Sequence, residues 1–150
     1  MSDFELSFCT KLYIKFKIYT SYFGNSAELE RNNCVIVGIC CFPPKDLKYN
    51  LKIVAPTKDI LDEKSSYSEY YKMYRDVLYG FNIADFFNEL EHISDETGGK
   101  DIALCCYEKP GEFCHRHLLA DFLNMWVPKM DCHEFSAKDI KIKEKSIELF

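Results

Sequence analysis

The chain has 150 residues, 47% of them apolar, and a formal net charge of -5 at pH 7. A chain of this length can bury one hydrophobic core without a second module, so we expect residues 1–150 to form a single domain. The negative charge argues against a broad basic surface for nucleic acids or anionic membranes, although it does not exclude a local basic patch.

The eight cysteines include two adjacent pairs inside apolar runs, at positions 40–41 and 105–106. Reduced cysteine packs as a small apolar side chain, and the first residues lack the basic and then apolar profile of a signal peptide. The longest apolar run, residues 35–42, is too short to cross a bilayer. We therefore predict a soluble, cytoplasmic protein with reduced cysteines and no membrane partner.

The first part of the chain predicts a strand, a turn and a short helix. Residues 8–19 alternate apolar and polar side chains over their second half, which is typical of a strand with one wetter face. Residues 20–25 end in a Gly-Asn pair that favours a turn, and we expect their hydroxyl groups to line a cleft. Residues 26–33 predict a short helix capped by Asn25 or Ser26.

A second strand is expected over residues 34–42, which are apolar on both faces. Strands of this kind are typical of a sheet that helices cover on both sides. Prolines at positions 43 and 44 end this strand. The weakly periodic residues 47–56 then predict a loop that contains a short strand at 51–54.

Two consecutive helices are expected in the middle of the chain. The first begins at Ser66 and stops at Gly80, and its apolar side chains, many of them tyrosines, recur every three or four residues. The second is capped by Asn82. Its buried face consists of large apolar side chains, namely Ile83, Phe86, Phe87, Leu90 and Ile93. Residues 94–99 contain two glycines and predict the loop that follows.

The last part of the chain predicts a strand, a tight turn and a third helix. Residues 102–107 form a continuous apolar run, and the Lys-Pro-Gly turn at 109–111 follows it. The helix begins near Cys114 and ends near Trp126. The tail then predicts a short strand at 131–135 and an alternating segment at 139–143.

This order of elements predicts an α/β fold: a single three-layer domain with a mainly parallel sheet flanked by helices. In such sheets ligands bind beyond the carboxyl ends of the strands, where loops run into helix N-termini. We therefore expect the functional site between the strand at 102–107 and the last helix.

Three reactive residues, Cys114, His115 and Arg116, stand at the start of the last helix. The helix dipole and nearby cations favour a thiolate there, so Cys114 is the predicted nucleophile. His115 is the candidate general acid or base, and Arg116 can hold a phosphate or carboxylate. Glu108 is predicted to orient one of the basic side chains. A structural role is an equal alternative, in which Cys114 packs, Arg116 pairs with Glu108 and His115 lies on the surface.

A metal site is another interpretation of the cysteines and histidines in this region. Structural zinc sites show two short ligand spacings, and the only close hit here is Cys114 with His117. The pairs at 105–106 and 132–133 supply one ligand each at most, because adjacent residues of a strand point to opposite faces. We therefore assign no metal, and the sequence identifies no cofactor.

Common catalytic and nucleotide-binding signatures are missing from the sequence. The chain lacks G-x-G-x-x-G, G-x-x-x-x-G-K-[ST], G-x-S-x-G and H-E-x-x-H. The dinucleotide, P-loop, serine-hydrolase and zincin classes therefore lose their usual support.

The segment LCCYEKPGEFCHRHLLADFLN, residues 104–124, resembles the signature of a bacterial and archaeal family called domain of unknown function 488 (YeaO-like proteins). Residues 20–23, residues 38–45 and the helix at 71–78 support the resemblance. It implies a small cytoplasmic α/β domain without an established activity. It also implies that the signature residues gather near one pocket, namely Cys106, Glu108, Cys114, His115 and Arg116.

Two functions follow from these residues, a first hypothesis and an alternative from a different class. In the first, the protein binds a small anionic, phosphate- or nucleotide-like ligand through the amides after Gly111, with or without enzymatic turnover. The predicted catalytic residues are Cys114, His115 and Glu108. The predicted ligand-binding residues are Arg116, Ser21, Tyr22, Cys106 and Lys45.

In the second, the Cys-His-Arg motif is structural and the protein is a non-enzymatic interaction module. Its partner is another protein or a nucleic acid, although the net charge of -5 disfavours nucleic acid. A homodimer built on the tyrosine-rich helix is one form that such a module can take.

Overall fold

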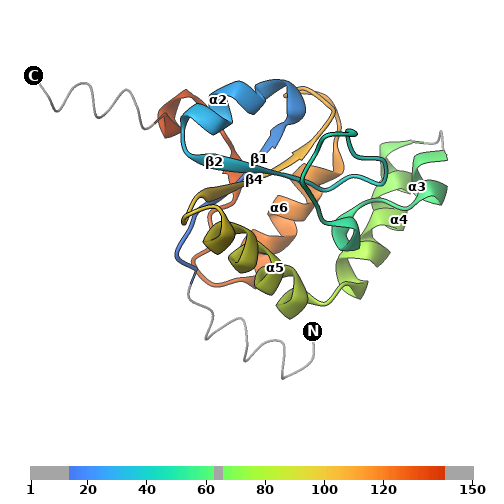
Figure 1. Ribbon diagram of the computed structural model, residues 1–150. Helices are drawn as coiled ribbons and strands as arrows, with labels where there is room; N and C mark the ends of the chain where they lie inside the picture. The colour runs from blue at the N-terminus through green and yellow to red at the C-terminus, as the bar shows by residue number, and fades with distance from the viewer. Residues whose placement is uncertain (1–13, 63–65, 141–150) are drawn as a thin grey trace, which may run out of the picture.

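The computed structural model describes residues 14–62 and 66–140 (Figure 1). Within them, five strands form one sheet: β1 (Ile18–Tyr22), β2 (Cys34–Gly38), β3 (Tyr49–Asn50), β4 (Asp101–Cys106) and β5 (His133–Glu134). The strands lie in the order β3-β2-β4-β1-β5, and every neighbouring pair is parallel. The predicted α/β class with a parallel sheet is confirmed.

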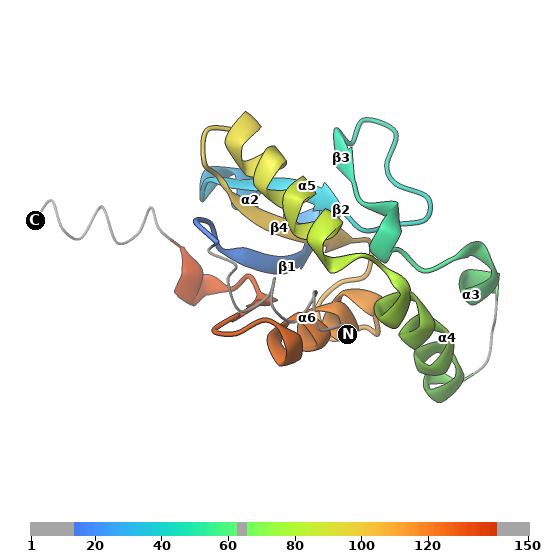
Figure 2. The same cartoon turned by 90° about the horizontal axis from the view of Figure 1, so that it is seen from below.

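Helices cover both faces of this sheet. The helices are α2 (Ser26–Arg31), α3 (Lys58–Asp62), α4 (Tyr67–Gly80), α5 (Ile83–Glu96) and α6 (His115–Trp126). In Figure 1, α2 lies above the sheet, and α5 and α6 lie below it. Figure 2 shows α3 and α4 beyond the arrowheads of the central strands. The carboxyl ends of these strands therefore point toward α3 and α4 (Figure 1 and Figure 2).

The central strand β4 is buried on both faces, as its apolar sequence predicts. Ile102 and Leu104 join the large core cluster with α4, α5 and α6, whereas Ala103 and Cys105 pack in a smaller cluster with Leu29 of α2. This alternation follows from the pleat of the strand. It also turns Cys106, the last residue of β4, away from the α2 face and toward the carboxyl edge beside α6.

The first strand begins later than the sequence predicts. Residues 14–17 are irregular, β1 covers Ile18–Tyr22, and residues 8–13 of the predicted strand lie outside the described residues. A strand requires hydrogen-bonding neighbours, and β4 begins at Asp101, one residue before the partner of Ile18. β1 also continues beyond residue 19 to Tyr22, and the Gly-Asn pair that favoured a turn lies in the 3-10 turn η1 (Phe23–Asn25).

The segment after β2 also differs from its prediction. β2 ends at Gly38, and the side chain of Asn50 then bonds both the backbone nitrogen and oxygen of Cys40, at 3.1 and 2.9 Å. This side chain takes the place of a strand partner. The predicted strand at 51–54 is wrong: residues 49–50 pair instead, and Lys52–Val54 forms a 3-10 turn, η2.

Helix α3 was not expected, because it is only five residues long and lies in a weakly periodic region. The Oγ1 atom of Thr57 accepts a hydrogen bond from the backbone nitrogen of Ile60 at 3.4 Å and caps its start. The predicted helices at 66–80 and after Asn82 are confirmed, and the Asn82 side chain accepts from the nitrogen of Asp85 at 3.0 Å.

Smaller differences concern the ends of the remaining elements. α5 continues to Glu96, so the loop predicted at 94–99 is shorter. α6 ends at Trp126, as expected, and the strand predicted at 131–135 is the two-residue β5. Ala137–Asp139 forms a 3-10 turn, η3, and residues 141–143 of the alternating segment lie outside the described residues.

Candidate functional site

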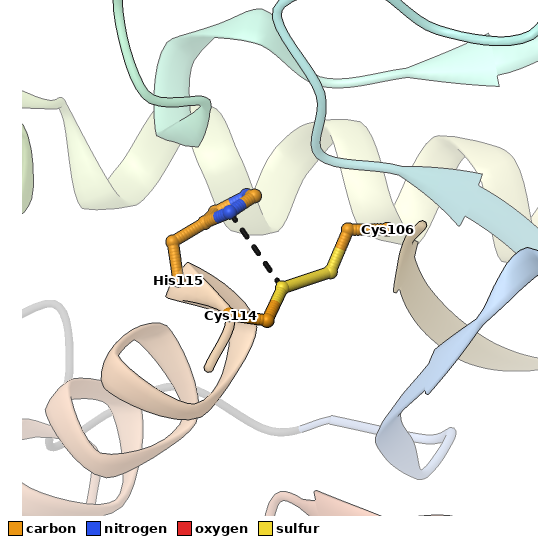
Figure 3. A group of neighbouring side chains, drawn as sticks. All are labelled: Cys106, Cys114 and His115. Carbon is orange, nitrogen blue, oxygen red and sulfur yellow. Dashed lines mark hydrogen bonds between the residues drawn. A yellow bond between two sulfur atoms is a disulfide. The ribbon is translucent and has the colours of Figure 1, made fainter. Parts of the chain in front are cut away.

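The carboxyl end of β4 and the start of α6 form the site, and two cysteines join them. Cys106 ends β4, and Cys114 is the extended N-cap residue of α6 (φ -152°, ψ 143°). Their sulfur atoms form a disulfide (Figure 3). This bond differs from the expectation that all cysteines are reduced. The strand end and the helix start come together because the Lys-Pro-Gly turn reverses the chain, with Gly111 at a φ of 90°.

His115, the first residue of α6, points its two ring nitrogens at different partners. Its Nε2 atom lies 2.6 Å from the backbone oxygen of Ile39, and its Nδ1 atom lies 3.8 Å from Cys114 Sγ (Figure 3). A carbonyl oxygen can only accept, so Nε2 carries the hydrogen in this contact. In a neutral imidazole, Nδ1 then has a lone pair directed at the sulfur of Cys114.

The neutral form of His115 is favoured by its surroundings. Burial lowers the pKa of His115 to about 4, the hydrogen bond to Ile39 opposes this shift, and the positive charge of Arg116 adds to it. The ring also packs edge-on against the ring of Tyr74, with 5.3 Å between centroids. If the Cys-His-Arg motif were purely structural, the sequence predicted His115 on the surface; its side chain is instead buried.

Arg116 is fully buried, and its guanidinium group is held by several acceptors. Nε and Nη2 donate to the two carboxylate oxygens of Glu134 at 3.0 and 2.9 Å, and Nη1 donates to the backbone oxygen of Glu108 at 2.7 Å. The Thr20 hydroxyl donates to the same Glu134 carboxylate at 2.6 Å. Burial raises the pKa of Glu134, but the hydrogen bonds from Arg116 and Thr20 outweigh it and hold this pKa below its ordinary value.

The same guanidinium lies beside the disulfide. Nη1 of Arg116 donates to Cys106 Sγ at 3.2 Å. A cation at this distance stabilises negative charge on a sulfur atom. Each sulfur of the pair thus has its own polar neighbour: Arg116 beside Cys106, and His115 beside Cys114.

A cavity of about 220 Å³ opens against this group. Cys106, Cys114, His115 and Glu108 line it together with apolar and aromatic residues, namely Phe42, Pro56, Leu61, Tyr70, Tyr107 and Phe113. Several of these aromatic side chains are partly exposed, including Phe42, Tyr107 and Phe113. We call the disulfide and the His115 imidazole the floor of the cavity, and the exposed rings of Phe42, Tyr107 and Phe113 its aromatic mouth.

The structure brings together four of the predicted site residues at this cavity, namely Cys106, Glu108, Cys114 and His115. Arg116 lies behind them, against Cys106. Glu108 contacts Arg116 through its backbone oxygen, and the carboxylate that pairs with Arg116 belongs to Glu134.

Three predicted ligand-binding residues, Ser21, Tyr22 and Lys45, are not among the described residues that line this cavity. Ser21 is buried opposite Cys105, on the other side of the sheet from the cavity, and its hydroxyl accepts from Asn25 at 3.2 Å. Lys45 is exposed on the loop between β2 and β3. The ligand-binding roles of all three residues stay predictions.

Sequence reasoning missed three groups that shape the site: Cys40, the Ile39 carbonyl and Glu134. Cys40 packs against the disulfide, and burial raises the pKa of its thiol to about 11. Cys40 and Ile39 follow β2, whose carboxyl end lies at the same edge as that of β4. Their position just after a buried parallel strand was the signal that could have placed them there.

Among the described residues, no helix is both long and apolar enough to cross a membrane. The ligand atoms of Cys106, Cys114 and His115 lie within 4.8 Å of one another, and these are residue types that bind metal ions.

Comparison with known protein families identifies most of the chain. The model of a family described as "Active DUF488-N3 subclade" (DUF488-N3a) matches residues 18–127. This range begins at β1 and ends just after α6, so it contains the cavity and its floor. No curated protein and no solved structure matches the chain.

Proposed function

The chain belongs to the DUF488-N3a family, and from the geometry of its Cys-His site we propose that it is an enzyme with Cys114 as nucleophile, acting on a small anionic ligand. The family match confirms the resemblance that residues 104–124 suggested. The observation that carries the proposal is the placement of His115. Its Nε2 atom is committed to the Ile39 oxygen, which leaves Nδ1 as the proton acceptor nearest to Cys114 Sγ.

The proposed chemistry begins with the reduced form of the site. A cellular dithiol reduces the Cys106–Cys114 bond to two thiols and is itself oxidised to a disulfide. The Cys114 thiol then gives its proton to Nδ1 of His115, and the sulfur forms a bond to an electrophilic atom of the ligand. The group that leaves this atom takes the proton from His115. A water molecule then gives a proton to Nδ1 and breaks the sulfur–ligand bond, and the released Cys114 thiolate regains its proton from His115. Glu108 lines the cavity, and its proposed role is to contact the ligand.

The ligand that we propose carries an anionic group and a planar or apolar part. The first backbone N–H groups of a helix lack acceptors in the preceding turn, and the helix dipole favours an anion at this end. In α6 the N–H of His117 donates to the Cys114 oxygen at 3.2 Å, so the ligand would meet the N–H groups of the two residues before it. The Cys114 side chain makes no capping hydrogen bond that would occupy them. The aromatic mouth suits a flat ring, as in a nucleotide-like compound. Arg116 contributes as a positioning residue from behind Cys106, since Glu134 engages its guanidinium.

We also propose a cytoplasmic location. Thiols are kept reduced there by glutathione and thioredoxin. The nucleophilic form of Cys114 would then be the resting form of the site.

The test is the alkylation rate of each cysteine in the reduced protein near neutral pH. Iodoacetamide labelling followed by peptide mass spectrometry should show Cys114 reacting faster than Cys41, which is partly exposed and lines the same cavity. His115→Gln should slow Cys114 by about tenfold or more, because the proton acceptor is lost. The matched control is His92→Gln, an exposed histidine of α5, which should change nothing. A nucleoside monophosphate should protect Cys114 more than inorganic phosphate does.

A second candidate function is an interaction module, and one observation favours it. The disulfide and the Arg116–Glu134 pair together tie β4, α6 and β5, as a structural lock would. Its docking surface would be the exposed tyrosines of α4, namely Tyr67, Tyr71 and Tyr79. Equal alkylation of Cys114 and Cys41, together with a dimer in sedimentation experiments that Tyr71→Ala disrupts, would favour this module over the enzyme.

A further inference from the structure

Beyond the proposed reaction, we infer that Cys106, Cys114 and His115 form a binding site for a thiophilic divalent cation such as Zn²⁺. The three ligand atoms come from two elements, the end of β4 and the start of α6, and lie within 4.8 Å of one another. Two thiolates and one imidazole are a ligand set that zinc accepts in proteins. The inference requires no turnover, and it stands or falls independently of the proposed enzyme.

The distance between Cys114 and His115 already suits a shared metal ion. A tetrahedral zinc with Zn–S of about 2.3 Å and Zn–N of about 2.0 Å places its sulfur and nitrogen ligands roughly 3.5 Å apart. The Sγ–Nδ1 distance is 3.8 Å. Two sulfur ligands of such an ion lie roughly 3.8 Å apart, so the sulfur of Cys106 has to separate from that of Cys114 before metal binds.

Two of the three ligand side chains form supporting hydrogen bonds of the kind found in known metal sites. A metal-bound histidine commonly donates its other N–H to a backbone carbonyl or carboxylate. Here Nε2 of His115 lies 2.6 Å from the Ile39 oxygen, which leaves Nδ1 for the metal. The sulfur of Cys106 likewise receives a hydrogen bond from Arg116 at 3.2 Å. The Ile39 oxygen thus fixes the position of His115, and the Arg116 guanidinium fixes that of Cys106.

The charges of the site are compatible with a divalent cation. Two thiolates balance the charge of Zn²⁺. The nearby guanidinium of Arg116 would repel the metal if it were alone, but it is paired with the Glu134 carboxylate at 2.9 Å. Zn²⁺ with its two thiolates has no net charge, and neither has the Arg116–Glu134 pair. Metal binding therefore buries no uncompensated charge.

The three ligand residues are buried in the protein, and they border a cavity. Cys106, Cys114 and His115 are 1%, 2% and 6% exposed, and all three line the 220 Å³ cavity. Three protein ligands with a neighbouring cavity leave the fourth position to water or a bound ligand. Catalytic zinc sites have this composition, whereas structural sites use four protein ligands.

The metal and the disulfide exclude each other. A dithiol reductant converts the disulfide to two thiols and is itself oxidised, and Zn²⁺ then displaces the two thiol protons. A sulfur bound to the metal is also less available as a nucleophile. Metal loading should therefore protect Cys114 from iodoacetamide, and the metal-bound and nucleophilic forms of the site are alternatives.

The test uses the full-length protein, reduced and freed of metal with a chelator. Zn²⁺ competition with a chromogenic chelator should show one equivalent bound, and Co²⁺ should give the absorption bands of tetrahedral thiolate ligation. Cys106→Ser, Cys114→Ser and His115→Gln should each weaken Zn²⁺ binding more than about tenfold. Cys41→Ser and His117→Gln are the matched controls and should bind as the natural protein does.

One control does not depend on how the variants fold. The natural protein with its disulfide closed by a thiol oxidant should bind no Zn²⁺ at this site, and reduction should restore the binding. Equal Zn²⁺ affinity in the oxidised and reduced forms, or in Cys106→Ser and the natural protein, would overturn the inference. Alkylation of the metal-free reduced protein reports on the proposed enzyme alone, so the failure of one proposal is distinguishable from the failure of the other.

Discussion

The guanidinium of Arg116 forms two parallel hydrogen bonds to the carboxylate of Glu134, at 3.0 and 2.9 Å. This pair connects the first turn of α6 to β5, a strand of only two residues whose one neighbour within residues 14–62 and 66–140 is β1. A strand this short has few backbone hydrogen bonds to hold it. We therefore expect the pair to be a main fastening of β5 to the sheet.

Arg116→Met should lower the free energy of unfolding by about 3 kcal/mol, because it leaves a partly buried carboxylate without its partner. Urea denaturation of the reduced proteins measures this change. The control is Arg31→Met, which removes an ion pair of the same 2.9 Å length between Arg31 and Glu28 whose arginine side chain is 62% exposed. That pair should contribute less than about 1 kcal/mol. Equal losses in the two variants would contradict the fastening role of Arg116.

His133 should make the stability fall as the pH rises from about 6.5 through the folded pKa of this residue. Its Nε2 and Nδ1 atoms lie 3.1 and 3.2 Å from carboxylate oxygens of Asp139 and Asp131. Burial lowers the pKa of His133, but the hydrogen bonds and charges of the two carboxylates outweigh it and raise this pKa above its ordinary value. The charged imidazole therefore stabilises the fold fully below about pH 6.5, the ordinary value, and less as the pH rises through the folded pKa.

Urea unfolding at several pH values between 6 and 9 should show this loss in the natural protein and a flatter profile in His133→Gln. NMR titration of the imidazole should give His133 a pKa above about 6.5, and Asp139→Asn should lower it. A pKa at or below that value in the natural protein would show that the carboxylates do not govern His133.

Gly38→Ala should destabilise the protein and disturb the cavity. A Cβ atom at this position would collide with Oδ1 of Asn50 and lie 2.5 Å from Cδ2 of Leu47. Asn50 cannot move freely, because its amide bonds both the nitrogen and the oxygen of Cys40. Such overpacking typically costs about 1–3 kcal/mol.

The control for this change is Gly80→Ala at the end of α4, where an added Cβ meets no atom within 4 Å. It should leave the unfolding free energy unchanged or raise it by up to about 1 kcal/mol, because alanine favours a helix. Thermal unfolding compares the two variants directly, and in Gly38→Ala the alkylation rate of Cys40 should also rise. An unchanged melting temperature in Gly38→Ala would mean that the Asn50 side chain moves away from the added Cβ atom without loss of stability.

Local patterns in the sequence were sufficient for the three longest helices and the class of the fold. The spacing of apolar side chains predicted α4, α5 and α6 because an amphipathic helix repeats within a few residues of the chain. The segments of β2 and β4 are apolar on both faces, and this pattern predicted a parallel sheet covered by helices. It too can be seen within a few consecutive residues. The rule that ligands bind beyond the carboxyl ends of strands then located the cavity beside Cys114 and His115.

The tertiary structure decided what these residues contact. Arg116 pairs with Glu134, 18 positions along the chain, and His115 bonds the oxygen of Ile39, 76 positions away. The start of β1 and the placement of β3 were likewise set by neighbouring strands. A local pattern determines which face of an element is buried, because its period is a property of the backbone. Which distant group meets that face depends on strand order and register, which arise only when the whole sheet assembles.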